Sequence, residues 1–217
     1  MVLSFRGEIG SGKTTAANFF AEKWGFHKVS LADPLKVEVY AALAIGAEEL
    51  ELFSNELNDP SVTYPITNLA PPLVSSRQEQ IDWVNKRKSV LGPLLQWWGT
   101  EYRRKRFGED YWLKRFKILC PPGSSTHFVV DDCRFDNEID YIQSIGGKHV
   151  YIVNKRASAF ADERNGNGGE LRRRTHASEK SNDPFDPRIW KSIDNSGTLD
   201  DFKFELALLA ITLCRET

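Results

Sequence analysis

The chain has 217 residues, which is enough for one domain with a full hydrophobic core and an inserted segment. Its 29 Lys and Arg residues are balanced by 30 Asp and Glu residues, and the net charge of −1 argues against general binding to nucleic acid or to a membrane surface. The 3 cysteines lack metal-ligand spacing, the first apolar run begins at Val2, and no apolar run approaches the roughly 18 residues of a membrane span, so we expect a soluble cytoplasmic protein.

The first expected element is a short buried strand, VLSF at 2–5, which leads directly into GEIGSGKTT at 7–15. This stretch matches G-x-x-x-x-G-K-[ST], in which glycines let backbone N–H groups turn toward an anion at a helix N-terminus. A helix that ends at Gly25 completes the strand, loop and helix of a phosphate-binding loop. We expect Lys13 to reach the β and γ phosphates of ATP and the Thr14 hydroxyl to bind Mg²⁺. The predicted ATP-binding residues are Gly7, Gly10, Ser11, Gly12, Lys13, Thr14 and Thr15.

Later strands are predicted near 27–32, 127–131, 148–153 and 190–194. Helices are expected between them: one over 136–145, which Gly146 and Gly147 end, and a last one opened by the capping pattern Thr198-x-x-Asp201. Five strands with helical crossovers predict an α/β fold, a three-layer αβα kinase-type domain with a mostly parallel sheet. Phosphate ligands are expected at the carboxyl ends of its strands.

Two segments do not fit that sheet, although we expect a single domain. The predicted core comprises 1–33, 121–154 and 189–217. Residues 34–120 predict a helical insertion, with an irregular proline-rich patch at 58–75 and a helix restarted by Ser76-x-x-Glu79. Residues 155–188 are rich in glycine and arginine and poor in apolar side chains, which predicts a lid.

Charged residues follow the strand predicted at 127–131. Asp131 and Asp132 stand at its carboxyl end, where a carboxylate can hold Mg²⁺ and its water shell; the alternative is a turn, and Asp136 is the better candidate for capping the next helix. Arg134 can clamp a phosphate with its planar guanidinium or pair with Glu138 four residues on, and both residues are predicted to belong to the substrate-binding site.

The predicted lid carries Arg164 and the run Arg172, Arg173 and Arg174 among glycines. Glycine joints could swing arginines over the transferring phosphates, excluding water and neutralising charge, and the alternative is a solvated basic loop.

The stretch LLQWWGTEYRRKRFGEDYW, at 94–112, combines aromatic side chains with polar ones. Trp97 and its neighbours could stack a nucleobase while Gln96 and Glu101 read base edges or sugar hydroxyls. The alternative is an ordinary aromatic core with a solvated basic face.

Three kinds of phosphate chemistry fit such a loop. A GTPase switch is disfavoured because Asn154 and Lys155 match N-K-x-D only until Ala157 replaces the carboxylate. An assembly ATPase normally needs additional sensor and oligomerisation elements, and this sequence ends soon after its fifth predicted strand. A small-molecule kinase needs an acceptor-binding insertion and a lid, and 34–120 and 155–188 fall where those belong.

Six ordered segments make the chain resemble the deoxynucleoside monophosphate kinases of tailed bacteriophages: GEIGSGKTTAANFF, LADPLK, LLQWWGTEYRR with DYWLKRF, VVDDCRFDNEIDYIQSIGG, HASE and IDNSGTLDDF. The resemblance implies transfer of the γ-phosphoryl group of ATP, with Mg²⁺, to a deoxynucleoside 5′-monophosphate. It implies that Lys36 and Arg134 hold the acceptor phosphate, that Gln96, Thr100 and Glu101 lie near the acceptor nucleoside, and that the lid arginines span both substrates. It also suggests a homodimer.

The chain departs from this family at Gly92 and Pro93, where some relatives have arginine, so Arg77 or Arg103 is the candidate substitute. Asp33 could order a water or an arginine, or cap the helix that Pro34 starts. Two alternatives remain: a kinase of another phosphorylated metabolite, similar to animal phosphomevalonate kinases, and a nucleotide-binding module that acts on a protein partner.

Overall fold

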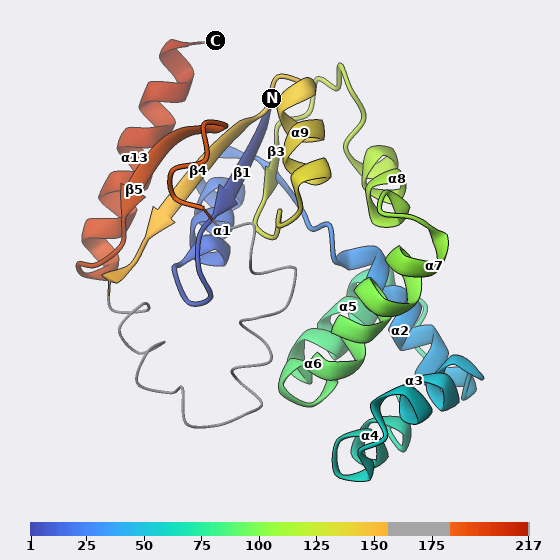
Figure 1. Cartoon of the computed structure of the whole chain (residues 1–217). Helices are drawn as coiled ribbons and strands as arrows, with labels where there is room; N and C mark the ends of the chain where they lie inside the picture. Colours follow the sequence, from blue (N-terminus) through green and yellow to red (C-terminus); the bar gives the residue numbers. More distant parts are fainter. Residues whose placement is uncertain (156–182, 217) are drawn as a thin grey trace. The chain divides into compact units, whose positions relative to one another are not determined.

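The computed structural model describes residues 1–155 and 183–216 of the chain (Figure 1). The chain divides into two compact units: Met1–Ser30 with Leu119–Thr217, and Leu31–Ile118. Each unit has its own hydrophobic core. The second unit has nearly the bounds of the insertion predicted at 34–120, and its role in binding an acceptor stays a prediction.

The first unit contains a parallel sheet. Its described strands are β1 (Val2–Arg6), β2 (His27–Val29), β3 (Phe128–Val130), β4 (Lys148–Val153) and β5 (Ile189–Asp194). They lie in the order β2-β3-β1-β4-β5, and all four pairings are parallel. The predicted α/β fold with a five-stranded parallel sheet is therefore confirmed (Figure 1).

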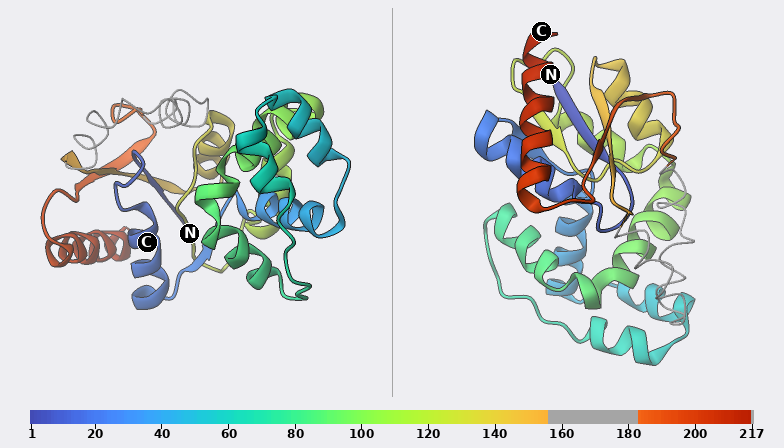
Figure 2. Two further views of the ribbon diagram at one scale, coloured as in Figure 1. Left: turned by 90° about the horizontal axis from the view of Figure 1, so that it is seen from below. Right: turned by 90° about the vertical axis from the view of Figure 1, so that its left-hand side faces the viewer.

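Alternation along β1 sends its side chains to two different layers. Leu3 and Phe5 pack in the core with α1 (Lys13–Trp24) and α13 (Leu199–Arg215), whereas Ser4 and Arg6 point to the opposite face of the sheet. Helix α9 (Asp136–Ser144) covers that second face (Figure 2). The face of β1 toward α1 and α13 thus contributes apolar side chains, and its other face contributes the buried polar side chains Ser4 and Arg6.

The second unit is helical throughout its regular structure. Its elements are α2 (Asp33–Ile45), α3 (Glu49–Leu57), α4 (Pro60–Thr67), α5 (Arg77–Lys86), α6 (Lys88–Gln96), the π-helix η1 (Trp97–Arg104) and α7 (Lys105–Phe107), while α8 (Tyr111–Leu119) ends at the boundary between the units. None of the helices in the described ranges combines the length and apolar character needed to cross a bilayer.

Two local predictions were wrong. The patch at 58–75 is not irregular throughout, because α4 forms within it: the Asp59 side chain accepts the N–H of Ser61, and Pro60 occupies the first turn, where its missing N–H costs nothing. Asp136 does not cap α9 but is its first residue.

The capping predictions at two other helices are confirmed. Ser76 accepts the backbone N–H of Glu79 at the start of α5. Thr198 and Asp201 exchange hydrogen bonds at the start of α13, which satisfies amide groups that the first turn of a helix leaves unpaired.

Candidate nucleotide-binding site

The loop after β1 has the backbone conformation that its glycines permit. Gly7, Gly10 and Gly12 have φ values of 134°, 82° and 106°, which side chains with a Cβ rarely adopt. A Cβ on Gly7 would lie 2.5 Å from the carbonyl oxygen of Ile152, and one on Gly12 would lie 2.4 Å from Nδ2 of Asn195. Torsion and close packing therefore both require glycine at these two positions.

Lys13 begins α1 and folds back over the loop. Its Nζ donates to the carbonyl oxygens of Gly7 and Glu8, at 2.6 Å each. The ammonium group is thereby held at the N-terminus of a 12-residue helix, where the dipole and the unpaired N–H groups also favour an anion. Thr14 and Thr15 follow on the exposed first turn.

Asn195, which sequence reasoning did not assign, contacts the loop from the end of the edge strand β5. It follows β5 directly, and its Nδ2 donates to the carbonyl oxygen of Ser11 at 2.8 Å. The only sequence signal was its place in the segment IDNSGTLDDF that carries the family resemblance.

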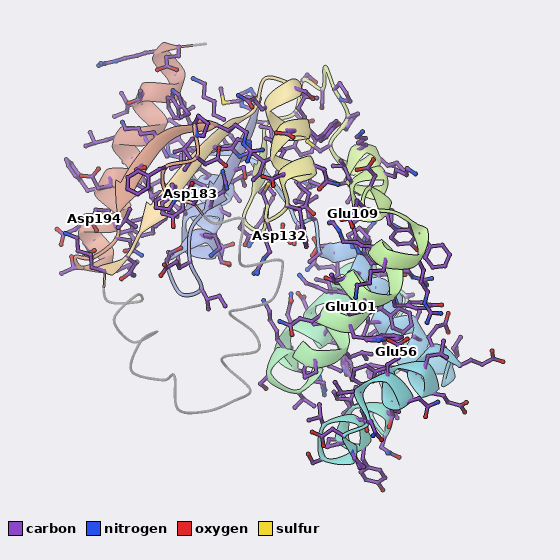
Figure 3. The ribbon with its side chains drawn as sticks, viewed as in Figure 1. Glu56, Glu101, Glu109, Asp132, Asp183 and Asp194 are labelled. Atoms are coloured by element: carbon purple, nitrogen blue, oxygen red, sulfur yellow. The ribbon has the colours of Figure 1, made fainter. Side chains whose placement is uncertain are left out.

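The carboxylates predicted to bind Mg²⁺ lie just after β3, the strand beside β1. Asp131 pairs with Lys28 of β2 at 3.1 Å, and Asp132, labelled in Figure 3, accepts a hydrogen bond from Ser30. Both contacts fix the carboxylate oxygens of these residues at the carboxyl end of β3, which neighbours the end of β1 where the loop begins. The described residues contain no cluster of three His, Cys, Asp or Glu side chains able to hold a metal, so Mg²⁺ would need phosphate oxygens and water besides these ligands.

Glu138 contacts the backbone at Arg134 and is not an exposed substrate ligand. It is buried, and its Oε2 accepts the N–H groups of Arg134 and Phe135 at 2.9 and 3.1 Å. The carboxylate fixes the backbone that presents Arg134 at the start of α9. This geometry disfavours the predicted substrate contact of Glu138.

A charge network that begins at the residue before the loop was missed by sequence reasoning; its centre, Arg6 and Asp186, is buried, and its outer carboxylates are exposed. Arg6, fully buried and directly before Gly7, pairs with Asp186 at 2.8 Å. Arg188 also reaches Asp186, at 2.8 Å, and bonds Asp136 and Asp140 of α9 at 2.6 Å each. Hydrogen bonds from Arg188, together with those from Arg6, hold the pKa of Asp186 far below its usual value. The sequence feature that could have indicated this network is Arg6, a charged residue directly after the apolar strand predicted at 2–5.

In the second unit, Asp33 and Lys36 share the first turn of α2. Their side chains form an ion pair of 2.9 Å. The helix begins at Asp33 itself, so this residue does not cap it; the position before the helix is Ala32. Of the two alternatives for Asp33, capping is excluded and an interaction with a cation is observed.

The predicted nucleoside-contacting residues gather on and beside η1. Gln96 ends α6, and Thr100 and Glu101 lie within the π-helix, a form often found at functional sites. Gly99 lets η1 approach α2 closely, because a Cβ there would be 3.1 Å from the Leu35 side chain. The elements that carry Lys36 and Thr100 are thus packed together within this unit.

Trp97 and Arg103 are engaged inside the unit, which disfavours their predicted substrate contacts. Trp97 is buried, donates to Glu56 at 2.7 Å and stacks on Tyr102 with ring centroids 5.1 Å apart. The guanidinium of Arg103 lies over the Tyr102 ring at 4.7 Å and donates to Glu38 at 2.8 Å. Here the ordinary-core alternative describes the aromatic stretch better. Arg77 is exposed at the start of α5.

Glu38, on α2, connects the elements around η1 and was also missed. Its carboxylate accepts hydrogen bonds from Trp98 at 3.2 Å, Arg103 at 2.8 Å and Tyr111 at 2.9 Å, and pairs with Arg115 at 2.9 Å. Burial and then Glu38 raise the pKa of Tyr111. A single glutamate on an amphipathic helix forms no sequence pattern that would predict so many side-chain partners.

The lid arginines Arg164, Arg172, Arg173 and Arg174 lie outside the described residues.

Comparison with known proteins supports the family resemblance. No protein-family model matches the chain. A protein of Acanthamoeba polyphaga mimivirus, described as a candidate deoxynucleotide monophosphate kinase, is 27% identical over 185 residues, which cover 79% of this chain and 82% of that protein. The resemblance seen in the sequence is confirmed by this relative.

Two solved structures are similar over the whole chain. A dephospho-CoA kinase from Campylobacter jejuni gives a TM-score of 0.46 at 18% identity, covering 99% of this chain and 98% of that one. A gluconokinase from Sinorhizobium meliloti 1021 gives 0.42 at 16% identity, covering 100% and 97%.

Proposed function

We propose that the chain is an ATP-dependent kinase that transfers the γ-phosphoryl group to the phosphate of a deoxynucleoside 5′-monophosphate. The observation that carries the proposal is the glycine loop with Lys13 folded over it at the N-terminus of α1, beside the strand-end carboxylates. The description of the viral relative supports a nucleotide as the acceptor.

Residues of the first unit would hold the donor. The loop N–H groups and Lys13 would bind the β and γ phosphates, while Thr14 with Asp131 or Asp132 would provide oxygen ligands for Mg²⁺. When bound, the metal ion would neutralise charge on the phosphates. Asn195 would keep the loop in its binding conformation through Ser11.

The acceptor phosphate would be bound by Arg134, whose backbone Glu138 holds, and by Lys36, as the family resemblance implies. Gln96, Thr100 and Glu101 would contact the nucleoside. An acceptor phosphate is already an anionic nucleophile, so the reaction needs alignment and charge neutralisation and no strong general base. The lid residues Arg172, Arg173 and Arg174 would supply further positive charge.

The test is release of ADP from ATP and Mg²⁺ with a panel of deoxy- and ribonucleoside monophosphates and phosphomevalonate. Lys13→Ala should abolish turnover, and Lys23→Ala, an exposed change at the other end of α1, should not. Turnover with deoxynucleotides that is lost only in Lys13→Ala supports the proposal. Turnover with phosphomevalonate alone, or none above the rate with ATP alone, contradicts it.

A further inference from the structure

Asp186, just before β5, accepts hydrogen bonds from two arginines in different parts of the first unit. Its Oδ2 accepts Nη1 of Arg6 at 2.8 Å, and the guanidinium of Arg188 donates to its Oδ1 at 2.9 Å and to its Oδ2 at 2.8 Å. The side chain of Arg6 is fully buried and that of Asp186 is 6% exposed. Strand β4 lies between β1 and β5 in the described sheet, so these side chains connect β1 with a segment that it does not pair with directly (Figure 1).

The bond to Arg6 acts on the end of β1 from which the phosphate loop leaves. Arg6 is the last residue of β1 and directly precedes Gly7. At the other end of β5, Asn195 donates to the carbonyl oxygen of Ser11, inside the loop. The segment 186–195 therefore contacts the loop and the residue before it at two separate points.

The bonds of Arg188 act on the start of α9. Its two terminal nitrogens donate to Asp140 and Asp136 at 2.6 Å each, and these carboxylates lie one helical turn apart on the same face of α9. On the same helix, Glu138 accepts the backbone N–H of Arg134. Arg188 thus fixes the first turns of α9 and, with them, the backbone at Arg134.

Stability alone gives a poor account of this arrangement. Removing two opposite charges from water costs free energy that their attraction does not always repay, and apolar side chains of similar volume often stabilise a protein equally well. Bidentate arginine–carboxylate bonds, in contrast, impose one geometry on the groups that they join. A carboxylate that orients two arginines at once is suited to fixing the positions of the elements that carry them.

We propose that Asp186 is a positioning residue, which through Arg6 and Arg188 fixes the phosphate loop and the backbone at Arg134 relative to each other within the first unit. The inference rests on the proposed function, in which these two places bind the donor and the acceptor phosphate. Phosphoryl transfer depends on alignment, and a misplacement of about 1 Å can lower a rate about 100-fold. Asp186 itself acts only through the two arginines.

The first experiment removes the charge of Asp186 and keeps its shape. In Asp186→Asn, kcat per folded molecule should fall about tenfold or more. The KM values for ATP and for the acceptor should change less than about threefold, because the groups that bind both phosphates remain. Asp200→Asn, the same change at a side chain that is 94% exposed on α13, is the matched control and should keep the kcat of the unmodified chain. An unchanged kcat in Asp186→Asn overturns the proposal.

Two further variants separate positioning from stability. Arg6→Met combined with Asp186→Leu replaces the buried pair by apolar side chains, so urea unfolding should show that much of the stability lost in Asp186→Asn returns, while kcat stays low. Arg188→Lys keeps the charge but lacks the planar fork that reaches three carboxylates, and it should also lower kcat. A kcat that recovers together with stability in the double variant would assign the pair a structural role and overturn the proposal.

Amide hydrogen exchange of the chain without substrates tests the coupling independently of turnover. In Asp186→Asn, exchange should become faster both in the loop at 7–15 and at 134–140, whereas α5 of the second unit should exchange as in the unmodified chain. Unchanged exchange in either of the first two segments overturns the proposal. A failure of the proposed function would instead show as absent turnover in the unmodified chain, so the two failures are distinguishable.

Discussion

At the scale of single residues, the phosphate loop depends on backbone torsions that only glycine adopts easily. We predict that Gly12→Ala weakens ATP binding about 5- to 150-fold, because a positive φ costs a residue with a Cβ about 1–3 kcal/mol and this Cβ would displace Asn195. Calorimetric titration with ATP measures the effect. Gly25→Ala is the control, since its φ of 69° imposes similar torsional cost in open space at the end of the same helix. Equal losses of ATP affinity in both variants would contradict a role for the loop.

Sequence analysis finds functional residues that form a motif of fixed local spacing. It misses residues whose contacts are with partners far away in the sequence. The glycines and Lys13 belong to one continuous motif. Arg6 and its partner Asp186 are separated by 180 positions, and Asn195 reaches Ser11 across 184. No pattern in a short window can show such contacts, because folding alone creates them.

At the scale of elements, Glu38 of α2 accepts hydrogen bonds from Trp98 and Arg103 of η1. We predict that Glu38→Gln, which keeps the shape but removes the charge facing Arg103 and Arg115, loosens η1. Near-ultraviolet circular dichroism of the tryptophans should change, and the KM for the acceptor should rise several-fold while the KM for ATP stays the same.

Glu51→Gln, an exposed change on α3, is the matched control for Glu38→Gln. A rise in both KM values, or an unchanged spectrum, would contradict the assignment. The spectrum reports on η1 whether or not the acceptor is a nucleotide.

Element positions followed closely from apolar runs and capping residues. The strand predicted at 148–153 has those bounds in the structure, and α5 begins after its predicted cap Ser76. The π-helix could not be foreseen, because its wider turn has no sequence signature of its own; Trp97, Trp98 and Tyr102 within it belong to the core of the second unit.

At the scale of the whole molecule, a buried histidine makes stability depend on pH. Burial lowers the pKa of His149 to about 4, and its Nε2 lies 3.1 Å from the Ile139 carbonyl oxygen. Between the unfolded value of about 6.5 and pH 4 the unfolded chain binds a proton that the folded chain does not. The free energy of unfolding should therefore fall as pH decreases through this window, by up to about 1.4 kcal/mol per unit.

Urea unfolding at pH 7 and pH 5 measures this dependence. His149→Gln retains a hydrogen-bonding side chain and removes the titration, so its loss of stability between the two pH values should be smaller. His27→Gln, an exposed change, should keep the dependence of the unmodified chain. An identical pH dependence in His149→Gln would show that another group is responsible.

The first unit is assembled from two stretches of chain on either side of Leu31–Ile118, and this affects the order of events during synthesis. β1 pairs only with β3 and β4 in the described sheet, and β2 pairs only with β3. On the ribosome, the whole helical unit emerges before either early strand has a neighbour, so it can fold first and bring the ends of the interruption closer. The phosphate loop follows β1 directly, so it gains its final structure only after the later strands β3 and β4 have been made.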